Sequence, residues 1–153
     1  MKNLFLTILF SFVPVVIVAI LGSLFVNLGM DWFSSLIKPT QWIPDFVIPI
    51  VWTVVYILAG VILFLLLRNG RFDKKLMALF IINGVLNILW CLLFFTLELT
   101  FLGLISIILN AIFAYYLVIE LNREGELYFY LLSIYPVWLS VATCLNLAIW
   151  ILN

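Results

Sequence analysis

The chain has 153 residues, of which 68% are hydrophobic and only 9% are charged. Since a soluble protein carries roughly a quarter charged residues, this composition excludes an ordinary soluble domain. The net charge is zero and histidine is absent, so we expect no nucleic-acid partner, no metal site and no cofactor.

Five runs without a charged residue follow one another along the chain, and each is close to the ~20 residues that a helix needs to cross a membrane. They cover residues 4–29, 46–67, 76–97, 100–119 and 127–152. None of them shows the alternation of apolar and polar residues that a membrane barrel strand requires. We therefore predict an all-α fold, an integral membrane bundle of five transmembrane helices that forms a single domain over residues 1–153.

The first run follows Lys2, and in this respect it is similar to a secretory signal peptide. It is longer than the usual apolar core of a signal peptide, and no A-x-A cleavage site ends it. We expect it to remain in the bundle as a membrane helix.

The placement of basic residues predicts the orientation of the bundle. Five crossings put the N-terminus and the loops at 68–75 and 120–126 on the same side. That side carries six of the seven basic residues, namely Lys2, Arg68, Arg71, Lys74, Lys75 and Arg123. Because the only other basic residue is Lys38, the positive-inside rule predicts a cytoplasmic N-terminus, with the 30–45 loop and the C-terminus external.

Aromatic and amide side chains recur at helical spacing in three of the runs. The three stripes are Trp52, Tyr56 and Gly60; Asn83, Asn87, Trp90 and Phe94; and Trp138, Ala142, Asn146 and Ile149. Each stripe lies on one face of its helix, and the rise of 1.5 Å per residue brings the stripes to the same leaflet. A pocket between helices, roofed by the 30–45 loop, is one explanation of this pattern.

Plain packing between helices is the other explanation. Amides in membrane helices often form hydrogen bonds to a neighbouring helix, and tryptophans near helix ends often lie at the membrane interface, as we expect for Trp150. Ser106, Asn110 and Ala114 form a weakly polar stripe that we assign to helix packing or self-association. Spacing alone leaves both explanations of the amides open.

Three segments, in this order, resemble the translocator protein family, whose members are also called tryptophan-rich sensory proteins (TspO/MBR) or peripheral-type benzodiazepine receptors. They are "WFSSLIKPTQWIPDFVIPIVWTVVYILAG", "NGVLNILWCLLFF" and "YPVWLSVATCLNLAIWILN". The resemblance implies a five-helix bundle, often a homodimer, that binds porphyrin or haem-type tetrapyrroles, and in some members sterols or synthetic benzodiazepine-type ligands. The positions that match the family's pocket motifs are Trp52, Tyr56, Asn83, Asn87, Trp90, Phe94, Trp138, Ala142 and Asn146.

The sequence also departs from the family pattern. Asn83 stands where glutamine is usual, Ile43 replaces the first of two loop prolines, and Gln41 stands where an aromatic is usual. Pro136 follows Tyr135 instead of preceding it, and no basic residue comes after this tyrosine. The proposed sterol pattern of Leu or Val, Tyr, then Lys or Arg is therefore missing there, which lowers our expectation of sterol binding.

These observations favour a membrane receptor or carrier that binds a flat hydrophobic tetrapyrrole. The five runs contain no ionisable Asp, Glu, Lys, Arg or His for a proton relay, and no nucleophile stands beside a base. The alternative, which the resemblance implies, is enzyme-like light-dependent porphyrin degradation that uses Trp52 and Trp138. Binding is the favoured hypothesis, and enzymatic activity stays an open alternative.

Overall fold

The structure is a computed structural model that describes residues 3–40 and 43–153, so Lys2 and Gln41 lie outside the described residues. The described part of the chain consists of helices and short connections, without a β-strand. Its elements are α1 (Leu4–Leu28), α2 (Met30–Ser35), α3 (Val47–Asn69), α4 (Lys74–Cys91), the π-helix η1 (Leu92–Thr96), α5 (Thr100–Glu124), α6 (Glu126–Leu132) and α7 (Ile134–Leu152).

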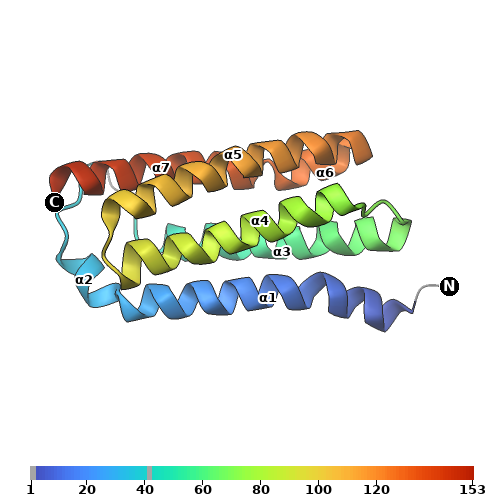
Figure 1. The fold of residues 1–153 in the computed structure, drawn as a ribbon, viewed down its shortest axis with the longest axis horizontal. Coiled ribbons are helices and arrows are strands. Elements are labelled where there is room, and N and C mark those ends of the chain that lie inside the picture. The colour runs from blue at the N-terminus through green and yellow to red at the C-terminus, as the bar shows by residue number, and fades with distance from the viewer. Residues whose placement is uncertain (1–2, 41–42) are drawn as a thin grey trace.

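Five helical segments are long and apolar enough to cross a membrane, which confirms the predicted five-helix membrane bundle. They are Leu4–Leu28, Val47–Asn69, Lys74–Thr96, Thr100–Glu124 and Glu126–Leu152, so η1 continues α4, and α6 and α7 together form the fifth span. The five spans lie side by side along one common direction, with α1 at one edge and α5 and α7 at the other (Figure 1).

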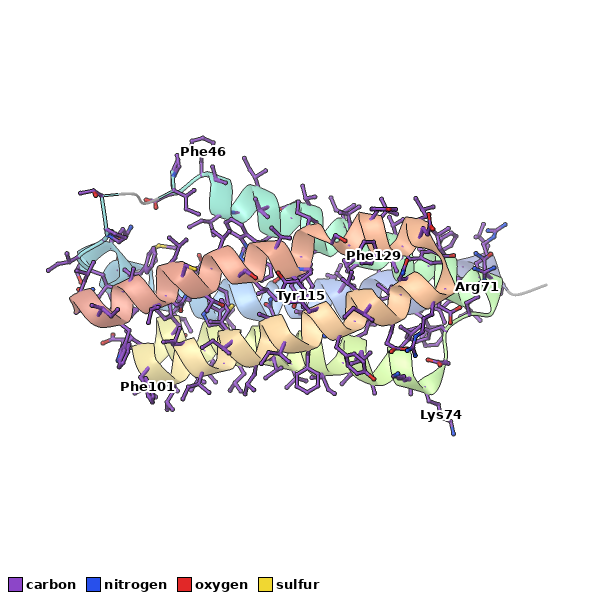
Figure 2. The ribbon with its side chains drawn as sticks, turned by 90° about the horizontal axis from the view of Figure 1, so that it is seen from above. Phe46, Arg71, Lys74, Phe101, Tyr115 and Phe129 are labelled. Atoms are coloured by element: carbon purple, nitrogen blue, oxygen red, sulfur yellow. The ribbon has the colours of Figure 1, made fainter. Side chains whose placement is uncertain are left out.

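The two ends of the bundle differ in chemistry. Arg71 and Lys74 lie at one end, which we call the basic end, whereas Phe46 and Phe101 lie toward the opposite one (Figure 2). Figure 1 shows α2 and the C-terminus of α7 together at this second end, which we call the loop end. The side of the membrane that each end faces stays a prediction from the charge pattern.

The turn between α3 and α4 is built by its own residues. Gly70 has a left-handed φ of 68° and ends α3, with its N–H directed at the Leu66 and Leu67 carbonyls. The Asp73 side chain then accepts a hydrogen bond from the Leu76 N–H at 2.8 Å, so it caps the first turn of α4. Both helices consequently reach beyond the apolar runs that mark them in the sequence.

Four features differ from the prediction based on hydropathy. The 30–45 loop contains the short helix α2, and the third span ends in the π-helix η1. The fourth span continues to Glu124 instead of ending at residue 119. The fifth is interrupted at Ser133, three residues before Pro136, whose missing N–H cannot continue the hydrogen-bond ladder of α6.

The extension of α5 brings a carboxylate into the bundle at the basic end. Glu120 is only 7% exposed, and it forms ion pairs with Lys75 at 2.8 Å and with Arg123 at 3.0 Å. The pairs explain how the helix can carry an acidic residue past the apolar run, since a buried charge needs partners.

The interior of the bundle is close-packed around α5, which has the largest buried share of the five spans, whereas α1 has the smallest. α1 is held by close approach, because a Cβ on Gly60 of α3 would lie 2.6 Å from the Phe12 ring. The weakly polar stripe of α5 is buried inside the bundle. Ser106 donates to the Leu86 carbonyl at 3.4 Å, so its role is packing within one chain.

Candidate ligand-binding site

A small cavity lies near the loop end, between α2, α3, η1, α7 and the end of α4. It has a volume of about 40 Å³. Its walls are formed by Phe33, Ile48, Trp52, Trp90, Phe94, Phe95, Trp138, Ala142, Leu145 and Asn146. None of these residues carries a charge, so the cavity is an apolar, aromatic-rich site.

The structure brings six of the nine predicted site residues together at this cavity. They are Trp52, Trp90, Phe94, Trp138, Ala142 and Asn146. Tyr56, Asn83 and Asn87 are not among the lining residues. Tyr56 lies about one helical turn further from the loop end than Trp52 of the same helix. Asn87 and Asn83 lie about one and two turns further than Trp90 of their helix.

Four lining residues were missed by the prediction, and three of them had a signal in the sequence. Ile48 precedes Trp52 by four residues, Leu145 follows Trp138 by seven, and both therefore lie on predicted faces. Phe95 is the second member of the phenylalanine pair in the third helix. Phe33 lies in α2, where a six-residue helix offers no periodicity from which its direction could be predicted.

Stacked aromatic rings from three helical elements line the site. Trp52 stacks on Trp90 with ring centroids 5.9 Å apart and 28° between the planes. Trp90 stacks in turn on Phe94 at 6.3 Å, and Trp52 stacks on Tyr56 at 5.7 Å. The four rings come from α3, α4 and η1, so they join separate helices, and aromatic pairs contribute about 0.5–1.5 kcal/mol beyond the area they bury.

Two polar side chains at the cavity have contrasting states. Asn146 is satisfied, because it accepts a hydrogen bond from Trp90 Nε1 at 3.1 Å and donates to the Ala142 carbonyl at 2.9 Å. Trp138 is only 8% exposed, and its buried Nε1 finds no acceptor within the described part of the chain. An unsatisfied buried donor costs about 1–3 kcal/mol, and this donor belongs to a residue that lines the cavity.

Two of the amides further from the loop end accept hydrogen bonds from other helices of the same chain, and a third binds its own helix. Asn87 accepts a hydrogen bond from the Tyr56 hydroxyl at 3.1 Å, and Asn110 of α5 accepts one from the Tyr135 hydroxyl of α7 at 3.1 Å. Asn83 donates to the Leu79 carbonyl of its own helix at 2.8 Å. Packing therefore explains Asn87, whereas the buried Oδ1 of Asn83 finds no donor among the described residues, and a contact of either amide with a ligand stays a prediction.

The size of the cavity limits what it can hold without change. A volume of about 40 Å³ accommodates only a few water molecules. Pockets for drug-sized ligands measure roughly 300–1,000 Å³, so a larger planar ligand has to displace the side chains that close the site. The chemistry offered is an aromatic slot lined by Trp138, whose buried indole N–H lacks an acceptor among the described residues, and this suits a flat apolar molecule that carries a hydrogen-bond acceptor.

The fold and this site define an integral membrane helix bundle with an aromatic cavity at one end. Comparison with known proteins gives the family. The sequence model of the TspO/MBR family matches residues 10–151. The chain is 30% identical over 145 residues to the tryptophan-rich protein TspO of Archaeoglobus fulgidus, with 94% of each chain covered. It is 32% identical over 136 residues to the tryptophan-rich protein TspO of Chlorobaculum tepidum, with 86% of each chain covered. The chain therefore belongs to the TspO/MBR family.

Proposed function

We propose that this protein is a membrane receptor or carrier that binds a tetrapyrrole of the porphyrin or haem type in the cavity at the loop end. The observation that carries the proposal is Trp138 Nε1, a buried donor without an acceptor among the described residues, in a site otherwise built from rings. A planar macrocycle can stack on Trp52 and Trp90, while a ring nitrogen or carboxylate on it accepts from Trp138.

The test is a titration of tryptophan fluorescence with protoporphyrin IX, haem and cholesterol in parallel, corrected for the inner-filter effect. We expect saturable quenching by the two tetrapyrroles and little response to cholesterol. Saturation by cholesterol alone, or no saturation by any of the three, contradicts the proposal.

Trp138→Phe tests the donor itself. The change keeps a ring at the cavity wall and removes only the N–H and part of the ring. Since a net hydrogen bond contributes about 0.5–1.5 kcal/mol, we expect tetrapyrrole affinity to fall about two- to tenfold. The matched control is Trp150→Phe on the same helix, because Trp150 is 43% exposed on the outer surface and packs on Phe101 instead. Equal affinities of the two variants contradict the assignment of Trp138.

A second candidate function is light-dependent degradation of the bound porphyrin. The observation that favours it is that Trp52 and Trp138 both line the cavity, so two indoles would lie beside a photoexcited ring. Illumination of the complex, followed by its absorbance spectrum, separates the two functions. Loss of the porphyrin bands that depends on both light and Trp138 supports degradation, and stable bands support binding alone.

A further inference from the structure

The cavity is closed on the loop end by α2 and the extended residues that follow it. We call residues 30–40 the cover segment. Its contact with the cavity is Phe33, which is 8% exposed and packs edge-on against Phe94 at 6.2 Å and in a tilted arrangement against Phe95 at 5.2 Å. Because the cavity holds only about 40 Å³ with this ring in place, a larger ligand that enters from this end has to move Phe33.

The cover segment is joined to the far wall of the cavity by one side chain, that of Asn153. The Ile37 N–H donates to Asn153 Oδ1 at 2.9 Å, and Asn153 Nδ2 donates to the Ile37 carbonyl at 3.1 Å. The two bonds engage both polar groups of the Ile37 backbone, across a sequence separation of 116 residues. A single amide thus pairs with the cover segment as a neighbouring strand would.

The Asn153 side chain is itself fixed to the last turn of α7. Its Nδ2 also donates to the Ile149 carbonyl at 2.9 Å, and its backbone N–H donates to the same carbonyl at 3.1 Å. α7 carries the cavity residues Trp138, Ala142 and Asn146. The amide therefore connects the cover segment to the helix that forms the opposite wall, and Figure 1 shows this helix end beside the chain that leaves α2.

We infer that Asn153 is a positioning residue that holds the cover segment, and through it Phe33, closed over the ligand cavity. The pair of hydrogen bonds between Asn153 and Ile37, which we call the clasp, exists in the free protein. Its role in ligand binding rests on the proposed function. Two net hydrogen bonds contribute about 1–3 kcal/mol together, which shifts an opening equilibrium by about 5- to 150-fold. Ile37 is 63% exposed and water competes for its backbone, so we expect an effect near the lower limit, about five- to tenfold.

The first experiment needs no ligand. Hydrogen exchange is measured on the purified protein in detergent, for the wild type, Asn153→Ala and the control Asn122→Ala, which truncates an exposed asparagine of α5 toward the basic end. We expect exchange of the 33–40 peptide to be about five- to tenfold faster in Asn153→Ala only, with α3, α4 and α5 unchanged. If the 33–40 peptide exchanges in Asn153→Ala at the same rate as in the wild type, the inference is wrong.

The second experiment measures ligand access by stopped-flow quenching with protoporphyrin IX. If the segment closes again over the bound ligand, loss of the clasp lowers the same barrier in both directions. We therefore expect the association and dissociation rates of Asn153→Ala to rise together by about five- to tenfold, with Kd changed less than twofold. A change in Kd with an unaltered association rate overturns the positioning role, because loss of a direct ligand contact has that signature. If the wild type binds no tetrapyrrole, the proposed function fails, while hydrogen exchange still decides the clasp.

Discussion

Replacing Asn87 by leucine separates the two explanations of the amides in the third span. Asn87 is 3% exposed and accepts a hydrogen bond from the Tyr56 hydroxyl at 3.1 Å. Leucine fits the apolar interior but leaves this hydroxyl without its acceptor. Hydrogen bonds between membrane helices contribute about 0.6 kcal/mol on average, and an orphaned buried group costs about 1–3 kcal/mol. We therefore expect Asn87→Leu to lower the free energy of unfolding by about 1–2 kcal/mol.

The assay is unfolding in mixed micelles, arranged as a double-mutant cycle. Tyr56→Phe removes the donor, and the double variant removes both partners, so it leaves no orphaned hydroxyl between α3 and α4. We expect the double variant to be more stable than the sum of the single changes predicts, by at least about 0.6 kcal/mol. The control is Asn27→Leu on the exposed face of α1, which should leave stability unchanged within about 0.5 kcal/mol.

The same variants measure ligand affinity. Since Asn87 lies outside the cavity walls, we expect Asn87→Leu to change tetrapyrrole affinity by less than about threefold, which corresponds to roughly half a net hydrogen bond. If instead stability is unaltered and affinity falls more than tenfold, Asn87 faces the ligand. That result would refute the packing role that the structure gives to this amide.

Four further predictions concern the rest of the bundle. In a variant without the native cysteines, an impermeant thiol reagent added from outside should label Ser35→Cys and not Phe72→Cys, and the reverse result overturns the predicted orientation. Gly29→Ala should destabilise the protein by more than about 3 kcal/mol, since a Cβ there would collide with a backbone carbonyl of η1. The control Gly22→Ala should be tolerated in the same thermal melt, because a Cβ on Gly22 would lie 3.5 Å from the nearest atom, Cys91 Sγ. Glu120→Gln should lower the free energy of unfolding by about 1–2 kcal/mol at low salt. This is less than the cost of breaking a fully buried pair, because the side chains of Lys75 and Arg123 are 44% and 69% exposed. Added salt should reduce the difference between the variant and the wild type. The homodimer that the family resemblance implies predicts twice the chain mass in light scattering in mild detergent, and a single chain mass contradicts it.

The spans and the aromatic walls could be predicted because simple physics determines them. The thickness of the hydrocarbon core sets the length of each apolar run, and the exclusion of charge marks where each run ends. The helical period of 3.6 residues then places Trp52, Trp90 and Trp138 on interior faces. Helix ends were less accurate, because Glu120 can stay in α5 through its ion pairs, which depend on contacts between spans.

Other features depend on how the helices are rotated against one another, which periodicity does not specify. The face of Asn87 could be predicted from its spacing, but its partner Tyr56 is fixed by the rotation of α3 against α4. The π-helix has no signature in the sequence Leu92–Thr96, and it lies where Gly29 and Gly103 approach Phe95 and Phe94 closely. The clasp of Asn153 on Ile37 joins residues that are 116 positions apart through a side chain, so no local sequence pattern predicts it.

The walls of the cavity differ in the free energy needed to move them. η1 is held on both sides by glycines, since a Cβ on Gly103 would lie 2.9 Å from Phe94 Cβ and one on Gly29 would overlap the Phe95 carbonyl. Parting α4 from α7 would separate Trp90 from Asn146 and leave two buried polar groups unpaired, at about 1–3 kcal/mol for each group. Lifting the cover segment breaks two hydrogen bonds to the 63% exposed Ile37, which water can replace at a net cost of about 1 kcal/mol, and it also withdraws the buried Phe33 ring from Phe94 and Phe95. Of these three walls, only the cover segment can move without unpairing buried polar groups or shifting a close glycine contact to η1, so we expect a ligand to enter from the loop end.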